Sequence, residues 1–215
     1  RGVSNIGVEI DSDRTRILQP RRPGSEEIRR AVEVPHADGS VDSSQVRHAL
    51  RGFAGRDAVV APPPGELELR PVRLPALDGE ELREAARWEV ASVLGVDGSD
   101  LVAEPLVVSR QPGEDGRMEM LVVAGRASRL SSLLEPLLEA GLRPSSVEPG
   151  FLAAARVFAR RSRRDAEREE VRLVIEVGSE SSWLVVMRGD AVVFAKSVDI
   201  GASDIDREIA RDLGI

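Results

Sequence analysis

Residues 7 to 18, GVEIDSDRTRIL, bring acidic and basic side chains together in a strand-turn-strand pattern. Val8 and Ile10 alternate as in a half-buried strand, a polar turn follows at 11–13, and a second strand-like segment begins at 15. Acidic hairpins of this kind are typical of plain surface turns, and several nucleotide-binding folds also present a phosphate loop in this way. These residues alone leave both interpretations open.

A similar stretch occurs a second time in the chain. Residues 8–18, VEIDSDRTRIL, align with residues 175–185, IEVGSESSWLV, at a fixed offset, and eight of the eleven positions agree in residue type. Glu9 corresponds to Glu176, and Ser12 corresponds to Ser179. Each copy opens a globular region and is followed by further strand-like sequence. A unit that repeats at long period predicts a duplicated architecture.

Composition excludes several classes of function. The 215 residues carry 37 acidic and 30 basic side chains, so the net charge of −7 argues against a nucleic-acid-binding protein. The chain has no cysteine, which excludes disulfides and thiolate metal sites. No apolar run approaches the roughly 20 residues of a membrane span. Because the chain starts at Arg1 and stops at ARDLGI, we interpret it as a fragment that ends at the start of a helix.

Hydrophobic periodicity predicts an α/β protein, and the expected elements alternate along the chain. We expect a hairpin at 5–18, a strand at 28–34, a helix at 42–52, strands at 57–61 and 66–77, and a helix at 79–94, followed by strands at 101–109 and 118–124 around a turn at 111–116, helices at 126–141 and 147–161, a charged linker at 160–172, and three strands within 173–201.

The helix at 79–94 has the clearest pattern. Asp78 precedes it and Glu81 follows three residues later, which predicts a capping box. One apolar stripe is expected to face the core, formed by Leu82, Ala85, Ala86, Val90, Val93 and Leu94. Trp88 lies off this stripe. It packs at the edge of the core or serves as a partner-binding anchor, since tryptophan is favoured at interfaces.

Two internal segments resemble the type IV pilus assembly protein PilM. Residues 69–108 look like the inserted subdomain of that family, and LREAARWEV at 82–90 is the most specific part. Residues 121–158 continue the resemblance, with EAGLRP at 139–144 as the second specific motif. In order along the chain, the resemblance covers nearly all 215 residues. The cell-division protein FtsA is a more distant relative, and the L component of type II secretion is a closer competitor.

The resemblance implies an α/β fold of the actin-like (ribonuclease H-like) type with an inserted α/β subdomain and a truncated second half. The first actin-like domain is then expected at 1–63 and 148–168, the inserted subdomain at 64–147, and the start of the second actin-like domain at 171–215. In actin-like ATPases and sugar kinases two such hairpins face each other across a cleft, and their backbone amides hold nucleotide phosphates.

The resemblance also implies site residues. The phosphates of ATP would lie against two turns, formed by Asp11, Ser12, Asp13 and Arg16 in the first copy and by Gly178, Ser179, Ser181 and Ser182 in the second. Glu9 and Glu176 would help to hold Mg²⁺ and its waters. The family has glycine and lysine where this chain has Asp11 and Arg16, so the first phosphate turn is damaged. We therefore expect ATP–Mg²⁺ to bind weakly or not at all.

By the same resemblance, the chain is a cytoplasmic scaffold of pilus assembly at the inner face of the inner membrane. It would dock on the N-terminal tail of a PilN-like inner-membrane partner, with Trp88 as a candidate contact, and would be peripheral to the membrane through that partner. A homo-oligomer stays open. The alternatives are a type II secretion L-like cytoplasmic domain and, from another class, an active sugar- or acetate-kinase-like enzyme. No hydrolase signature stands out, so we assign no catalytic residues.

Overall fold

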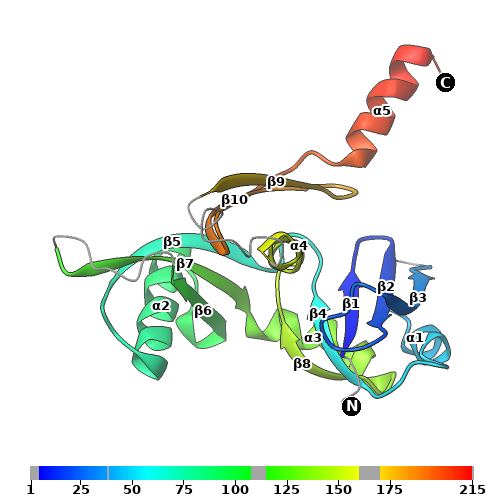
Figure 1. Ribbon diagram of the computed structural model, residues 1–215, viewed down its shortest axis with the longest axis horizontal. Coiled ribbons are helices and arrows are strands. Elements are labelled where there is room, and N and C mark those ends of the chain that lie inside the picture. Colours follow the sequence, from blue (N-terminus) through cyan, green and yellow to red (C-terminus); the bar gives the residue numbers. More distant parts are fainter. Residues whose placement is uncertain (1–4, 38, 108–114, 160–169, 215) are drawn as a thin grey trace. The chain divides into compact units, whose positions relative to one another are not determined.

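The computed structural model describes residues 5–37, 39–107, 115–159 and 170–214 (Figure 1). The chain divides into two compact units, and each is described by itself. Unit 1 comprises Arg1–Leu67 and Arg126–Gly150, and unit 2 comprises Glu68–Gly125 and Phe151–Ile215. The start of the turn expected at 111–116 and most of the charged linker expected at 160–172 lie outside the described residues. Strands and helices alternate along the chain, which confirms the α/β class.

Unit 1 is built on one five-stranded sheet in the order β3-β2-β1-β4-β8. Its strands are β1 (Ile6–Ile10), β2 (Arg14–Pro20), β3 (Ile28–Pro35), β4 (Asp57–Ala61) and β8 (Arg143–Val147). The predicted hairpin is present, because β1 and β2 pair in antiparallel register with Val8 opposite Ile17. β4 then pairs with β1 in parallel, with Val8 beside Val60, and β8 pairs in parallel with β4.

The helix between β3 and β4 places two apolar side chains on this sheet. α1 (Ser43–Ala49) is capped by Asp42, whose Oδ1 accepts hydrogen bonds from the backbone N–H groups of Ser44 at 2.7 Å and of Gln45 at 3.2 Å. This cap satisfies two of the N–H groups that a helix start leaves without partners. Val46 and Leu50 then lie one turn apart and are both buried.

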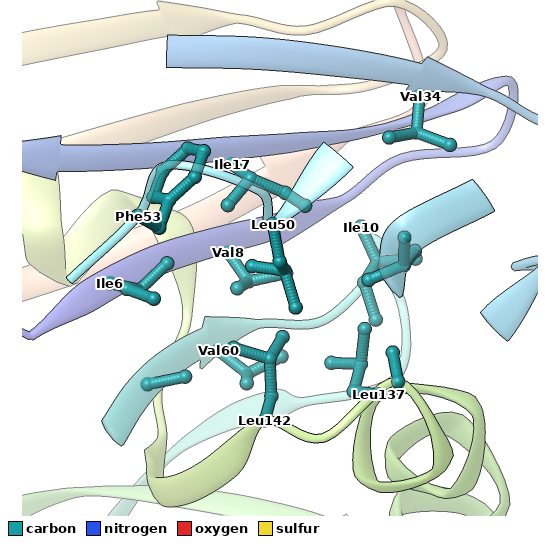
Figure 2. Close-up of a cluster of buried hydrophobic side chains, with 13 residues drawn as sticks. Ile6, Val8, Ile10, Ile17, Val34, Leu50, Phe53, Val60, Leu137 and Leu142 are labelled. Carbon is teal, nitrogen blue, oxygen red and sulfur yellow. The ribbon is translucent and has the colours of Figure 1, made fainter. Parts of the chain in front are cut away.

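The core of unit 1 lies between α1, α3 (Ala127–Glu139) and one face of the sheet (Figure 2). Figure 2 shows Ile6, Val8 and Ile10 from β1 turned toward the side chains that cover them. The cluster is entirely aliphatic apart from Phe53, as the scarcity of aromatic residues requires. Its buried members are Ile6, Val8, Ile10, Ile17, Val34, Val46, Leu50, Phe53, Ala58, Val60, Leu137, Ala140 and Leu142.

The first sheet of unit 2 has the order β5-β7-β6, with α2 (Gly79–Leu94) packed against it. Its strands are β5 (Glu68–Pro75), β6 (Leu101–Val107) and β7 (Arg117–Arg126). β5 is an edge strand, which explains how it accommodates Pro71 without breaking the ladder. A short 3-10 helix, η1 (Gly98–Asp100), connects α2 to β6.

Helix α2 confirms the predicted boundaries and corrects two details. Leu82, Ala86 and Val90 are buried as expected, but Val93 has 63% of its surface exposed, so it was wrongly assigned to the inward stripe. The residue that completes the buried face is Ala91. Asp78 occupies the N-cap position, yet its side chain makes no capping hydrogen bond, so the predicted capping box is also wrong.

The predicted apolar face of α3 also needs one correction. Leu130 and Leu137 are buried, and Leu133 and Leu134 are partly buried, as the expected apolar face requires. Leu138 was assigned to the same face but is exposed. The five leucines have the spacing of a single apolar face, and Leu138 lies at one border of that face, where it turns to solvent.

The second sheet of unit 2 contains β9 (Val171–Val177), β10 (Ser182–Arg188) and β11 (Ala191–Val198) in the order β11-β10-β9. α4 (Gly150–Ala159) packs against it through Phe151 and Ala155. α5 (Ala202–Leu213) follows β11 and ends at Gly214, whose φ of 69° makes a left-handed C-cap. The expectation that the chain stops at the start of a helix is therefore wrong, because this helix is twelve residues long and closed by a cap.

Candidate functional site

The first candidate turn is closed by its own backbone and by Asp11. The Asp11 N–H donates to the Arg14 carbonyl at 2.9 Å, which makes the turn tight. The Asp11 carboxylate turns back, and its Oδ1 accepts a hydrogen bond from the Ser12 N–H at 2.8 Å. Only 14% of the Asp11 side chain is exposed. A backbone donor of the turn is thus occupied by a carboxylate from the same turn.

Arg16 lies among three carboxylates. Its Nη1 donates to Glu9 Oε2 at 2.9 Å and to Asp11 Oδ2 at 3.3 Å, and its Nε lies 3.4 Å from Glu33 Oε1. The hydrogen bond to Glu9 is the main cause that raises the pKa of Arg16 above its usual value. The guanidinium therefore stays charged and is held inside the hairpin. The structure brings together three predicted site residues, Glu9, Asp11 and Arg16.

Asp13 pairs with Arg14, and Arg14 shares Glu33 with Arg16. The Asp13 carboxylate accepts hydrogen bonds from the Arg14 guanidinium, with an Nη2 to Oδ2 distance of 2.7 Å, and this contact lowers the pKa of Asp13. Arg14 also donates to Glu33 at 2.9 Å. Half of the Asp13 side chain is exposed, so the pair lies in solvent, and surface pairs of this kind stabilise a fold only slightly.

The second candidate turn is joined to the start of α5. The Gly178 N–H donates to the Ser181 carbonyl at 2.9 Å, which closes the turn. The carbonyls of Gly178 and Ser179 then accept hydrogen bonds from the N–H groups of Ala202 at 2.8 Å and Ser203 at 2.9 Å. The first two N–H groups of α5, which have no partner within the helix, thus donate to carbonyl oxygens of the turn. The turn and the helix start form one hydrogen-bonded unit.

Gly201 makes this close approach achievable. A Cβ at this position would lie 2.2 Å from the Ser179 carbonyl oxygen, a distance that no side chain can occupy. Sequence reasoning did not identify Gly201 or Ser203 as part of this site. The available signal was the glycine directly after a strand and before a helix, which marks a close backbone approach.

The serines of the second turn have different environments. Ser182 is buried, and its Oγ donates to the Ile200 carbonyl at 2.6 Å. Ser179 Oγ lies 3.3 Å from Ser203 Oγ. Ser181 Oγ is buried and has no hydrogen-bond partner among the described residues. Glu176 faces Trp183 across the β9–β10 pair.

The two candidate turns lie in different units, and the predicted pairing of the hairpins across a cleft stays a prediction. Glu9 belongs to unit 1 and Glu176 to unit 2. Among the described residues, no group of three or more histidine, aspartate or glutamate side chains is arranged to hold a metal ion.

Trp88 on α2 has a defined position although 53% of its surface is exposed. The Arg87 guanidinium lies over the Trp88 ring, 5.4 Å from the ring centroid. The ring also rests against Gly98 in η1, where a Cβ would lie 2.7 Å from Trp88 Cζ3. One side of the indole is therefore packed and the rest is accessible, and a role of Trp88 in partner binding stays a prediction.

No protein-family model matches this sequence, and no curated protein matches it. Among the described residues, no helix combines the length and the apolar character needed to cross a membrane. Solved structures do match. A chain of the PilM-PilN type IV pilus biogenesis complex superposes with a TM-score of 0.82 at 23% sequence identity. The match covers 99% of this chain and 66% of that chain, so this chain spans less than two thirds of that one.

Two further structures share the architecture. The cytoplasmic domain of EpsL, an inner-membrane component of the type II secretion system of Vibrio cholerae, gives a TM-score of 0.63 at 15% identity, over 91% of this chain and 71% of that domain. A Bacteroides thetaiotaomicron protein of unknown function with an actin-like ATPase fold gives 0.55 at 9% identity, over 99% of this chain and 77% of that protein. The chain therefore has an actin-like ATPase fold, and it is similar to structures from type IV pilus and type II secretion systems.

Proposed function

We propose that the chain is a cytoplasmic scaffold of a type IV pilus machine, which docks on the N-terminal tail of a PilN-like inner-membrane protein. The observation that carries this proposal is the match to a chain of the PilM-PilN complex over 99% of the present chain. The localisation follows from the proposal: the scaffold lies at the inner face of the inner membrane and is peripheral to it through its partner.

Trp88 is the proposed anchor for that tail. Tryptophan contributes strongly to interfaces when it fills a pocket on the partner. Here the contacts with Arg87 and Gly98 already hold the indole in place, so little side-chain freedom is lost when a partner binds. A short extended or helical tail with an apolar side chain opposite the indole would match this surface.

The scaffold would work without nucleotide. The Asp11 carboxylate accepts hydrogen bonds from the Ser12 N–H and the Arg16 guanidinium. It therefore takes the place that a phosphate oxygen would have at these two donors. A phosphate would have to displace this carboxylate and would meet its charge. In the second turn, the N–H groups at the start of α5 donate to carbonyl oxygens. These contacts support a degenerate nucleotide site in which ATP–Mg²⁺ does not fit.

Calorimetric titration tests the docking. The N-terminal tail peptide of a PilN-like inner-membrane protein from the same organism is titrated into the protein, with and without ATP–Mg²⁺. We expect the same affinity in both conditions, and an affinity at least about tenfold weaker for Trp88→Ala, as for an interface anchor. Val102→Ala, which changes another exposed apolar residue of unit 2, is the matched control. Unchanged binding by Trp88→Ala would refute the anchor, and no binding by the parent would refute the docking.

The similarity to EpsL favours one alternative, a scaffold of the type II secretion system. The two proposals differ in the partner. Titration with the cytoplasmic tails of both kinds of inner-membrane protein distinguishes them, because the tail from the cognate system binds more tightly.

A further inference from the structure

One end of the sheet in unit 1 collects arginine side chains. The strand register places the start of β1, the end of β2 and the starts of β3, β4 and β8 at this end, since Ile6 lies beside Ala58 and Pro20 lies opposite Ile28. α1 and α3 also end here, because the chain passes from them into β4 and β8. We name this region, formed by residues 20–30, 47–57 and 139–143, the basic end. It carries four carboxylates and eight arginines, which are Arg21, Arg22, Arg29, Arg30, Arg47, Arg51, Arg56 and Arg143.

The opposite end of the same sheet has the reverse arrangement. There Arg14 and Arg16 lie among the carboxylates of Glu9, Asp11, Asp13 and Glu33. The chain as a whole has a net charge of −7, so the excess of positive charge at the basic end runs against the average of the protein. The basic end is therefore a local feature that composition does not explain.

Among the described residues, ion pairs neutralise two of the eight arginines. Arg21 Nε lies 3.4 Å from Glu27 Oε2, and Arg143 Nε lies 3.0 Å from Asp57 Oδ1. A guanidinium group stays charged throughout the physiological pH range. The arginines that make no ion pair with the described residues are Arg22, Arg29, Arg30, Arg47, Arg51 and Arg56.

Contacts with the loop at 51–56 bring some of these groups together. Arg30 Nη1 lies 3.1 Å from the point where a Cβ on Gly52 would stand, and the Arg30 guanidinium carbon lies 5.6 Å from the centroid of the Phe53 ring. Arg56 Nη1 lies 3.4 Å from the carbonyl oxygen of Phe53, to which it donates. Two guanidinium groups from different strands therefore meet at one loop, and neither of them is paired with a carboxylate of the described residues.

Arg47 and Arg51 extend this group along the end of α1. They lie about one helical turn apart, with Arg47 inside the helix and Arg51 just after it. Arg47 Nη2 donates to the Glu139 carbonyl at 2.5 Å, where α3 ends. A helix C-terminus favours a nearby cation, which explains Arg47 but not the arginines on β3 and before β4. The carbonyl contacts hold these side chains in place and leave their charges uncancelled.

Two exposed apolar side chains accompany the arginines. Ile28 precedes Arg29 on β3, and Leu138 precedes Glu139 on α3, with 58% and 55% of their surfaces exposed. Surfaces that lie on a membrane combine these two kinds of side chain, because the lipid phosphates attract the cations and the boundary with the acyl chains receives the apolar groups.

We propose that the basic end of unit 1 binds the anionic surface of the membrane directly, in addition to the contact through the protein partner. The arginines bind lipid phosphates, and Ile28 and Leu138 enter the headgroup layer. The choice of lipid as the source of the anions rests on the proposed function, which puts the chain at the inner face of the inner membrane. Since the rest of the protein is acidic, the contact also fixes which end of the scaffold faces the membrane.

Vesicle sedimentation tests the proposal on the purified protein. The vesicles contain about 30% phosphatidylglycerol in phosphatidylcholine, and vesicles of phosphatidylcholine alone are the uncharged reference. We expect binding to the anionic vesicles that falls steeply between about 0.05 and 0.3 M salt, because salt screens exposed charges. No binding to the anionic vesicles at low salt, or equal binding to both kinds of vesicle, would overturn the proposal.

A triple variant identifies the surface that binds. Arg22→Gln, Arg29→Gln and Arg51→Gln together remove three exposed charges whose side chains make no hydrogen bond with the described residues, so the thermal midpoint should stay within about 2 °C of the parent. Each arginine near an anionic membrane strengthens binding about fivefold, so this variant should bind the vesicles about 100-fold more weakly. The matched control removes three exposed charges outside the basic end, by Arg117→Gln, Arg126→Gln and Arg188→Gln.

The control variant should lose less than about fivefold in affinity, since its arginines lie away from the membrane. Equal losses in the two triple variants would mean that net charge alone governs binding, and would overturn the assignment to the basic end. Tighter binding of the parent to polyglutamate than to the vesicles would identify an acidic protein as the occupant, and release from the vesicles by inorganic phosphate beyond the effect of ionic strength would identify a site for free phosphate. Either result overturns the proposal.

The same assay separates this proposal from the docking of the partner tail. The vesicles contain no protein, so Trp88→Ala should bind them as the parent does. Loss of tail binding with intact vesicle binding would contradict the docking alone, and the converse result would contradict the membrane contact alone.

Discussion

Replacement of Asp11 by glycine should create a measurable affinity for ATP–Mg²⁺. The substitution removes a carboxylate that accepts a hydrogen bond from the Ser12 N–H and pairs with Arg16. The Ser12 N–H then becomes available to a phosphate, while Arg16 keeps its contacts with Glu9 and Glu33. Two unit charges about 4 Å apart repel by about 1 kcal/mol in water and by about 4 kcal/mol at an effective dielectric constant of 20. Since Arg16 already neutralises part of the Asp11 charge, we expect a gain of about 1 to 2 kcal/mol.

That gain corresponds to a dissociation constant about 5- to 30-fold lower than in the parent. The assay is isothermal titration calorimetry with ATP–Mg²⁺ on the parent, on Asp11→Gly and on Asp13→Gly. The Asp13 variant removes the same charge two residues away, but it leaves Arg16 held by Glu9 and Asp11. It should therefore gain much less than the Asp11 variant.

Two outcomes would refute this reasoning. Micromolar binding of ATP–Mg²⁺ by the parent would mean that Asp11 does not block the phosphates, and it could instead hold the water shell of Mg²⁺. An equal gain in both variants would mean that net charge near the turn controls binding, and that the contacts of Asp11 with Ser12 and Arg16 do not.

Three further predictions concern stability. Leu82→Ala should lower the free energy of unfolding by about 2 to 5 kcal/mol, whereas Val93→Ala on the same helix should change it by less than about 0.5 kcal/mol, as measured by urea denaturation. Gly201→Ala should lower the thermal midpoint, because a Cβ would lie 2.2 Å from the Ser179 carbonyl; an unchanged midpoint would show that the turn and α5 are not joined as described. The hydrogen bond from the Ser44 hydroxyl, followed by the capping bonds from the Gln45 and Ser44 N–H groups, lowers the pKa of Asp42 in the folded state. Its contribution is therefore present above the unfolded pKa of about 3.9 and is lost as the pH falls through the lower folded value. Asp42→Ala should lower the thermal midpoint at pH 7 and lower it less at pH 3, and an equal loss at both values would contradict the cap.

The sequence was sufficient to predict the elements whose burial follows a simple period. The hairpin at 5–18 and the helix at 79–94 appear where alternation and helical spacing place them. The actin-like fold also follows from the repeated hairpin together with the motif at 82–90, and the structural comparisons confirm it. These features depend on local pattern and on chain order, which a sequence displays directly.

Features that depend on long-range pairing were not accessible. β8 has the polar sequence RPSSV and no apolar alternation, yet it pairs with β4 because the chain returns beside that strand. Helical spacing places Val93 between Leu82 and Ala86 on the apolar stripe of α2 and Ala91 outside that stripe, yet Ala91 is buried and Val93 is exposed. Burial in the last turns of α2 therefore depends on what packs there, which the period does not show. The contact of Gly201 with the second turn is likewise a tertiary contact without a local pattern.

The pairing of Asp11 with Arg16 has the same origin. The sequence showed an acid in place of glycine and an arginine in place of lysine, but not that each binds the other across the hairpin. The predicted phosphate and Mg²⁺ roles of both turns, like the domain boundaries, stay predictions, because nucleotide binding and the placement of the units depend on more than the hairpins themselves.

Site-specific crosslinking in the cell tests the central claim most directly. A photoreactive amino acid is placed at position 88 on α2 and, as a matched control, at position 102 on β6, in the strain that produces this protein. Our account predicts a crosslink from position 88 to the N-terminal tail of the bitopic inner-membrane protein, and a much weaker one from position 102. No crosslink to that protein from position 88, or equal crosslinking from both positions, would contradict it.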